Sequence, residues 1–330
     1  MDLKNLDQTF MHFLLQHQLK NNRTLNFLVL MESILTTARL IQLNYIDGNL
    51  KNLLGSTDKT NIQDEQVQNL DEIANTLALH YLKESQQVIQ VVTEEVENPI
   101  ELNSGGRYFV YLDPLDGSSN IKHSLPVGFM FGIAKRNLEG PEDNHLRPAK
   151  EFIAAGIFII PSGIFTFALR DSGAYRFVID QSGNYIRPKK LEIGTNSKNW
   201  ELSFNASNTN FFNPKITDWL NSKVKDYNFR YSGSLAVDFH RLIDNGGMFL
   251  YPAITRHSDP KQNRPDGKLR LLYEAAVVAF IAKEAKGKAI NEQGIDIIEV
   301  QPILPHQRTT LFVGNPDLIK NIRQVLKGKL

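Results

Sequence analysis

One stretch, residues 107–120, limits how this chain can fold more than any other. Residues 107–112 are rich in β-branched and aromatic side chains, which predicts a short strand. Because proline has no N–H to donate to a sheet, we expect the strand to stop at Pro114. Gly117 then permits a tight bend. Two carboxylates, Asp113 and Asp116, are therefore expected at a strand end that faces a bend.

The bend is followed by polar side chains that can serve a ligand. Ser118, Ser119 and Asn120 can satisfy exposed backbone N–H groups at the start of the next element. Mg²⁺ prefers oxygen ligands such as the two carboxylates, and a phosphate needs hydrogen-bond donors. A short Asp-x-x-Asp match on its own is more often a plain turn than a metal site. The fragment alone leaves both interpretations open.

Composition excludes several classes of protein. The 330 residues suffice for one large or two moderate domains, and 42% hydrophobic residues suffice for a core. A net charge of +1 gives no support for a general nucleic-acid or membrane-surface role. With no cysteine, disulfides, thiolate metal sites and cysteine nucleophiles are excluded. Residues 1–20 have no apolar signal core and no segment has the ~20 apolar residues of a membrane span, so we expect a cytoplasmic protein.

The periodicity of the chain predicts both helices and strands. Apolar residues at helical spacing predict helices over 3–18, 24–45 and 64–84, with a polar loop over 49–61. A strand is predicted over 87–93, ending in Glu94 and Glu95. Further strands are predicted over 127–136, 151–160, 164–170 and 174–180, and their short spacing favours an antiparallel meander or a large mixed sheet.

A polar, turn-prone stretch at 193–200 predicts a division into domains 1–194 and 195–330. The second domain is predicted to hold helices over 216–223, 234–243 and 316–326, and a long apolar helix that ends near Lys286. Glu274, at the start of that apolar helix, would be costly there without a cation to neutralise it.

Asp-Pro-Leu-Asp-Gly-Ser-Ser-Asn, residues 113–120, resembles without a mismatch the metal-binding signature of class I fructose-1,6-bisphosphatase. A shorter version occurs across the lithium-sensitive phosphatase superfamily, which includes inositol monophosphatases. The resemblance runs through the whole chain, with a second strong motif at 268–274. It implies an α/β, layered sugar-phosphatase fold with N-terminal helices, a large mixed sheet and a second, smaller α/β domain.

The resemblance also implies a site for two or three Mg²⁺ ions, which Mn²⁺ or Zn²⁺ could replace. Its ligands would be Glu94, Asp113, Asp116, Glu274 and the carbonyl of Leu115. Asp71 and Glu95 would orient or deprotonate the attacking water, and Glu65 matches a nearby acidic loop position. From the residues alone, Asp71 lies off the centre of its helix's apolar face and is expected at the surface. Glu94 and Glu95 could likewise simply emerge into solvent.

The implied reaction is hydrolysis of fructose 1,6-bisphosphate to fructose 6-phosphate and phosphate, a step of gluconeogenesis. The matching substrate-binding positions are Asp116, Gly117, Ser118, Ser119, Asn205, Arg230, Tyr231, Tyr251, Lys268 and Arg270. The resemblance implies a homotetramer, and Arg230 falls on a position that reaches into a neighbouring subunit's site. Guanidinium, ammonium and phenol donors suit a dianionic phosphate.

The sequence departs from the family's pattern at several places. A Thr-Gly-Glu segment of the family's allosteric AMP site is absent, because residues 22–26 are Asn-Arg-Thr-Leu-Asn, although Arg107, Tyr108 and Lys135 match other positions of that site. The loop over 252–267 is about seven residues longer than usual. Sedoheptulose 1,7-bisphosphate or another superfamily substrate is the alternative to the fructose ester, and a catalytically inert sugar-phosphate sensor is a third interpretation.

Overall fold

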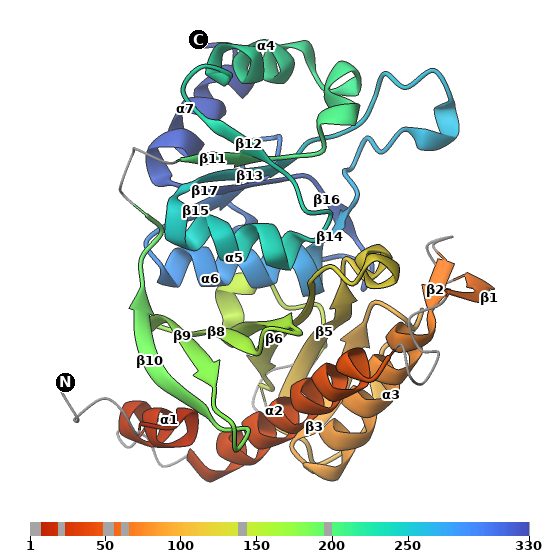
Figure 1. Cartoon of the computed structure of the whole chain (residues 1–330), viewed down its shortest axis with the longest axis vertical. Coiled ribbons are helices and arrows are strands. Elements are labelled where there is room, and N and C mark those ends of the chain that lie inside the picture. The colour runs from red at the N-terminus through yellow and green to blue at the C-terminus, as the bar shows by residue number, and fades with distance from the viewer. Residues whose placement is uncertain are drawn as a thin grey trace.

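The chain forms two stacked β-sheets with helices between them and on both outer sides (Figure 1). The computed structural model describes residues 8–18, 24–48, 56–60, 66–137, 144–194 and 200–329. The order of layers is helix, sheet, helix, sheet, helix, which confirms the predicted α/β fold with a large mixed sheet. No helix among these residues is long and apolar enough to cross a membrane.

Among the described residues the first sheet contains eight strands, and only one neighbouring pair in it, β3 and β5, is parallel. The other neighbours are antiparallel and follow one another along the chain, as the short turn spacing predicted. Strand β10 follows a polar turn and was not predicted from the sequence. In spatial order the strands are β10 (Tyr185–Leu191), β9 (Gly173–Ile179), β8 (Ile164–Leu169), β7 (Phe152–Ile160), β6 (Val127–Lys135), β5 (Tyr108–Asp116), β3 (Val88–Thr93) and β4 (Ile100–Glu101).

Strand β5 does not stop at Pro114, so that prediction was wrong. The strand continues to Asp116, and its pairing with β6 shifts register between Asp113 and Asp116. A bulge leaves a residue without a ladder hydrogen bond, so it can accommodate a proline that has no N–H to donate. The irregularity occurs at the two aspartates, where it changes the direction of their side chains relative to a regular strand.

Three helices cover the outer face of the first sheet: α1 (Phe10–Gln18), α2 (Thr24–Ile46) and α3 (Asn69–Glu84). Their apolar faces join one core with the sheet, and Phe10 contacts the rings of Phe165, Phe167 and Phe177. These helices were predicted, but α3 begins at Asn69 rather than near residue 64. The expected loop over 49–61 contains strand β1 (Ser56–Thr60), which pairs with β2 (Gln66–Gln68). Polar residues in a two-stranded ribbon give no hydrophobic alternation that would reveal it.

The second sheet contains five short strands in the order β12 (Asn228–Arg230), β11 (Glu201–Ser203), β13 (Gly247–Tyr251), β17 (Leu311–Gly314) and β15 (Lys288–Ile290). Helices α4 (Pro214–Lys223) and α7 (Pro316–Leu326) cover its outer face. Helices α5 (Leu235–Asn245) and α6 (Ala276–Glu284) lie between the two sheets. Residues 276–282 of α6 are all buried, because a helix packed between two sheets has no face left for solvent.

The predicted long apolar helix begins with a turn of different geometry. Residues Leu271–Ala275 form a π-helical turn, η7, that leads directly into α6. Before it, β14 (Leu269–Arg270) pairs with β16 (Arg308–Thr309). Single π-turns are rare and occur often at functional sites. Glu274 is part of this turn. The short 3₁₀ segments are η2 (Ser118–His123), η3 (Ala149–Glu151), η5 (Ala206–Phe211), η6 (Pro260–Gln262) and η8 (Ile297–Glu299).

Candidate metal and phosphate site

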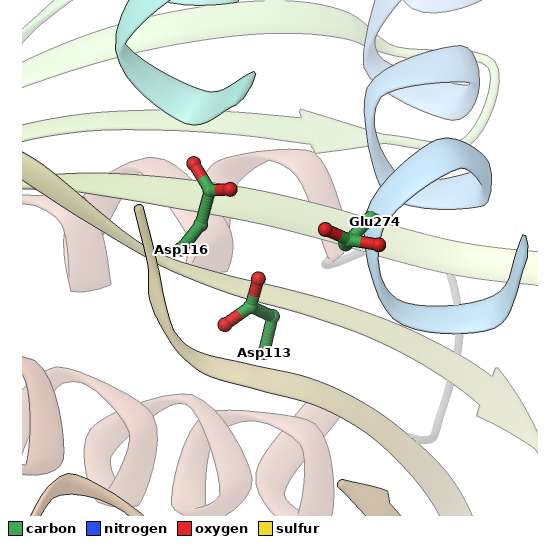
Figure 2. A group of neighbouring side chains, drawn as sticks. All are labelled: Asp113, Asp116 and Glu274. Carbon is green, nitrogen blue, oxygen red and sulfur yellow. The ribbon is translucent and has the colours of Figure 1, made fainter. Parts of the chain in front are cut away.

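Three carboxylates from distant parts of the chain point toward one another between the two sheets (Figure 2). Asp113 and Asp116 come from the bulged end of β5, and Glu274 comes from the π-turn η7. Each offers an oxygen, and these oxygens all lie within 4.8 Å of one another. The residues are only 1%, 7% and 8% exposed, so water cannot screen their mutual repulsion as it would at a surface.

Glu94 is the fourth acid of this group. It follows β3, the parallel neighbour of β5, and its N–H donates to the carbonyl of Leu112 at 3.1 Å. Burial and then the Glu94 carboxylate raise the pKa of Asp113 well above its usual range. Burial and Glu94 also raise the pKa of Glu274. We call Glu94, Asp113, Asp116 and Glu274 the four-acid cluster.

The two carboxylate oxygens of Asp113 differ in their hydrogen bonds. Asp113 Oδ1 accepts from the Leu115 N–H at 3.0 Å, whereas its Oδ2 is buried and has no donor among the described residues. The neighbouring Glu94 carboxylate can bond to that oxygen only if one of the two acids holds a proton. A buried carboxylate oxygen without a donor is costly unless a cation lies beside it. The cluster therefore fits a divalent cation, which prefers an all-oxygen ligand set.

Asp116 is fixed by the start of helix α5. Its Oδ2 accepts from the hydroxyl of Ser234 at 2.5 Å and from the N–H of Ala236 at 2.7 Å. Ser234 is also the N-cap of α5, since its Oγ accepts from the Val237 N–H at 3.2 Å. Burial raises the pKa of Asp116, while these hydrogen bonds act against that rise. The second half of the chain thus orients a carboxylate of the first.

Asp71, expected at the surface, is buried at 3% exposure in the first turn of α3, so that expectation was wrong. One turn later, Asn75 accepts a hydrogen bond from the hydroxyl of Thr93 at 2.8 Å. Residues four apart lie on one face of a helix, so Asp71 and Asn75 both face the end of β3. Glu94 and Glu95 follow that strand end and are half-buried rather than solvated. Glu65 lies outside the described residues, and so do residues 19–23, which include the start of the segment 22–26 compared with the AMP site.

The turn after β5 has the expected tight bend. Gly117 has a φ of +79°, and a Cβ there would lie 2.5 Å from the Cβ of Ser234. Only glycine tolerates both the left-handed backbone and this approach. The 3₁₀ segment that carries Ser118 and Ser119 begins directly afterwards, and the first N–H groups of such a segment have no partner within it. Asn120 donates to the carbonyls of Pro126 and Ser232, both at 3.1 Å, which fixes the turn against the second half.

Comparison with known proteins agrees with this geometry. Residues 8–190 match the family model described as Fructose-1-6-bisphosphatase, N-terminal domain, and residues 195–327 match that of the C-terminal domain. The chain belongs to the fructose-1,6-bisphosphatase family. The class 1 fructose-1,6-bisphosphatase of Syntrophus aciditrophicus is 54% identical over 327 residues, which cover 98% of each chain.

More distant members of the fructose-1,6-bisphosphatase family also match over nearly full length. Fructose-1,6-bisphosphatase 1 of Mus musculus is 31% identical over 97% of this chain and 95% of its own. The crystal structure of Leishmania major fructose-1,6-bisphosphatase in holo form superposes with a TM-score of 0.86. It is 28% identical, and the match covers 97% of this chain and 99% of that one. The resemblance inferred from residues 113–120 is confirmed.

The sugar-binding positions expected for a fructose-1,6-bisphosphatase lie on several elements of the second half. The Tyr231 and Tyr251 hydroxyls are hydrogen-bonded to each other. Burial, and to a smaller extent the interaction with Tyr251, raise the pKa of Tyr231. The charge of Asp116 also raises the pKa of Tyr231, so Tyr231 lies near the four-acid cluster. The buried Arg270, on β14, lowers the pKa of Glu274 with its charge and is therefore close to the cluster.

The remaining expected positions are more open. Asn205 is the N-cap of η5, and its Oδ1 accepts from the N–H and the hydroxyl of Ser207. Arg230, at the end of β12, and Lys268, before β14, are both exposed. An exposed Arg230 is consistent with a role outside this chain's own site.

Sequence reasoning did not assign four residues that support the site: Ser234, Asn75, Tyr273 and His306. Ser234 was expected to begin a helix, but its hydrogen bond to Asp116 joins residues 118 positions apart. Tyr273 is fully buried and its hydroxyl contacts the ring of His306. Only the position of Tyr273 beside Glu274 in the sequence could have singled it out.

Proposed function

We propose that this chain hydrolyses fructose 1,6-bisphosphate at the 1-phosphate, releasing fructose 6-phosphate and phosphate. The observation that carries the proposal is the convergence of the four-acid cluster beside the donor-rich turn 117–120. The chain around this site is 54% identical to a class 1 fructose-1,6-bisphosphatase over almost its full length. Phosphate monoesters react very slowly in water, so a catalyst must act strongly on the phosphoryl group.

We propose Glu94, Asp113, Asp116, Glu274 and the Leu115 carbonyl as ligands for two or three Mg²⁺ ions. The support is the all-oxygen donor set and the buried Asp113 Oδ2 without a donor. Bound Mg²⁺ would neutralise the phosphoryl oxygens, stabilise the leaving alkoxide and acidify water. Mn²⁺ and Zn²⁺ are alternative ions, because hard oxygen ligands also accept them.

We propose that Asp71 and Glu95 act on the attacking water. Asp71 is buried on the face of α3 that packs against the end of β3, and Glu95 follows that strand. A carboxylate held beside a water can orient it and accept its proton as the bond to phosphorus forms. No residue of the chain needs to become covalently bound to phosphate, and the chain has no cysteine that could.

The 1-phosphate would bind at the turn after β5. Gly117, Ser118 and Ser119 offer backbone N–H and hydroxyl donors there, and Asn120 fixes the turn from behind. A carboxylate-rich cluster repels a phosphate dianion, so these donors and the bound cations must offset that repulsion. Asp116 joins the two parts because it belongs to the cluster and directly precedes the turn.

The 6-phosphate and the sugar would bind to Asn205, Tyr231, Tyr251, Lys268 and Arg270, with Arg230 supplied by a neighbouring subunit of a homotetramer. Tyr231 and Tyr251 already share a hydrogen bond, so their hydroxyls are held together before substrate arrives. Lys268 directly precedes β14, and Arg270 is the second residue of that strand. Such cationic donors suit a second phosphate on the substrate.

The experiment that tests the substrate compares phosphate release from fructose 1,6-bisphosphate, sedoheptulose 1,7-bisphosphate and inositol 1-phosphate at equal Mg²⁺. We expect the fructose ester to have the highest kcat/KM. Lys268→Ala should raise KM for both bisphosphates and leave any reaction with inositol 1-phosphate unchanged. Preference for the sedoheptulose ester would keep the site and change the substrate. No release from any ester by the folded protein would favour an inert sugar-phosphate sensor.

Three further expectations stay proposals: the domain division at 194/195, the cytoplasmic location and the homotetramer. The division is supported by the two sheets, which use residues before and after that point. The loop over 252–267 lies beside the second sheet in Figure 1, and Thr255 donates to the carbonyl of Phe211 on η5. We therefore expect its extra length to change the position of the segment that Asn205 caps.

A further inference from the structure

A short chain of hydrogen bonds connects two ligand-bearing elements of the four-acid cluster. The hydroxyl of Tyr273, the residue before Glu274, lies 2.7 Å from Nδ1 of His306. On the other side of the ring, Nε2 lies 3.1 Å from the carbonyl oxygen of Val96 and 2.9 Å from that of Glu97. Val96 and Glu97 directly follow Glu94 and Glu95. We call residues 94–97 the acid turn.

The partners determine where the protons lie. Carbonyl oxygens only accept hydrogen bonds, so Nε2 of His306 must carry the proton that points at Val96 and Glu97. In a neutral imidazole Nδ1 then has a lone pair, and the hydroxyl of Tyr273 donates to it. Burial, with a smaller effect of the Arg270 charge, lowers the pKa of His306, which favours this neutral form. The direction of donation therefore runs from Tyr273 through His306 to the acid turn.

The loop that carries His306 is itself attached to the π-turn. Leu271, at the start of η7, donates its N–H to the carbonyl of Gln307 at 2.7 Å. The side chain of Gln307 accepts from the Ile303 N–H at 2.8 Å and closes the loop on itself. His306 is thus held relative to η7 at two points, through Tyr273 and through its neighbour Gln307. It contacts the acid turn 209 and 210 residues away in sequence.

We infer that Tyr273 and His306 are positioning residues that hold the acid turn against η7 and so set the affinity of the four-acid cluster for cations. Glu94 follows strand β3, whereas Glu274 belongs to the π-turn η7, and their two carboxylates repel each other. Attraction between the two side chains therefore cannot hold them at a common distance. Hydrogen bonds to groups behind the ligands typically change metal affinity or activity 10–100-fold when removed. The inference rests on the proposed function only for the catalytic part of its test.

The test measures cation binding without substrate. Thermal unfolding of the whole protein is followed while Mg²⁺ alone is added, which gives the concentration that produces half of the Tm increase. For Tyr273→Phe, which removes one oxygen from a fully buried side chain, we expect this concentration to rise about tenfold. His306→Phe should have the same effect, and combining the two variants should add little, since both break one chain of contacts.

Two conservative variants separate the halves of the connection. The longer side chain of His306→Gln can place its NH₂ near the position of Nε2 and donate to the Val96 and Glu97 carbonyls, whereas the shorter side chain of His306→Asn can place its oxygen near the position of Nδ1 and accept from the Tyr273 hydroxyl. Because the bonds to the acid turn position Glu94, the Gln variant should recover more of the Mg²⁺ affinity than the Asn variant. Tyr175→Phe is the matched control, because Tyr175, on β9, likewise donates one hydrogen bond from its hydroxyl, here to the carbonyl of Ser172 at 3.0 Å.

A purely structural role gives a different result. In that case the metal-free Tm of Tyr273→Phe would fall while the half-effective Mg²⁺ concentration stayed within twofold of the wild type, and the inference would be wrong. In phosphate release, positioning predicts a raised Mg²⁺ requirement with KM for fructose 1,6-bisphosphate little changed. If wild-type protein bound Mg²⁺ but hydrolysed no sugar phosphate, the proposed function would fail and the binding result would still decide the inference.

Discussion

The hydroxyl of Ser234 donates to Oδ2 of Asp116 at 2.5 Å, although the two residues are 118 positions apart. One hydrogen bond therefore joins the N-terminus of α5, in the second half of the chain, to the bulged end of β5 in the first. It fixes one oxygen of Asp116 and leaves the other to face Asp113 and Glu274 (Figure 2). The cluster can form only when both halves of the chain are folded and packed together.

Ser234→Ala tests this relationship. The variant loses the N-cap of α5 and a hydrogen bond to a charged group, which should lower the free energy of unfolding by about 1–2 kcal/mol. The freed Asp116 carboxylate should also raise the Mg²⁺ concentration needed for half-maximal phosphate release. Asn213→Ala is the control, because Asn213 caps α4 in the same way far from the cluster. If both variants showed the same Mg²⁺ requirement, Ser234 would be a cap and nothing more.

Asp113→Asn should stabilise the metal-free protein while abolishing its function. The substitution removes a carboxyl whose charged form burial and the Glu94 carboxylate disfavour, and the amide oxygen can still accept from the Leu115 N–H. We expect the Tm in EDTA to rise by roughly 1–3 °C and the Tm increase on adding Mg²⁺ to disappear. Asp218→Asn, at an exposed position on α4, controls for loss of a surface charge. A lower Tm in EDTA would contradict the repulsion that we infer.

Asp71→Asn should reduce turnover and spare substrate binding. The amide fills the same buried volume but cannot accept a proton from water, so kcat should fall by about 10²–10⁴-fold while KM changes little. Glu72→Gln makes the same chemical change at the next, exposed position of α3. A value of kcat within twofold of the wild type would remove Asp71 from the mechanism.

His240 predicts how stability depends on pH. It lies on α5 beside Arg176 and Asp244, and burial followed by the Arg176 charge lowers its pKa to about 4. A histidine that is neutral when folded stabilises fully above its unfolded pKa of about 6.5, and this stabilisation is lost as the pH falls toward 4. The loss is on the order of 3 kcal/mol at most.

Urea unfolding between pH 7 and pH 4.5 measures this contribution. His240→Phe should lose less stability over that range than the wild type, because it has no ring nitrogen to protonate. His12→Gln, on the exposed side of α1, should follow the wild-type curve. Parallel curves for wild type and His240→Phe would show that another group dominates the acid transition.

The local parts of the site could be predicted from the sequence, and its long-range contacts could not. The strand end with Asp113 and Asp116 and the bend at Gly117 were predicted from adjacent residues, and their metal role was predicted from the resemblance of residues 113–120 to a family signature. Most helices and strands were predicted from hydrophobic spacing, since each buries one face, and the layered fold was predicted from the family resemblance. The prediction that the strand stops at Pro114 was wrong, because a bulge can accommodate a residue that a regular ladder cannot.

Asp71 was predicted from the helical pattern to lie at the surface, but it is buried. Helical periodicity places it off the apolar face, and only the packing of α3 against the end of β3 buries it. The bond from Ser234 to Asp116 and that from His306 to the acid turn join residues 118 and about 210 positions apart. Such contacts depend on how the two sheets stack, which no local pattern in the sequence encodes.

Phosphate release from fructose 1,6-bisphosphate, measured in Mg²⁺, then in EDTA, then with Mg²⁺ restored, tests the central claim most directly. The account predicts fast release in Mg²⁺, loss of release in EDTA and full recovery, with none of the three states active in Asp113→Asn. Release that persists in EDTA, or an Asp113→Asn variant with wild-type turnover, would show that the four-acid cluster is not the catalytic metal site.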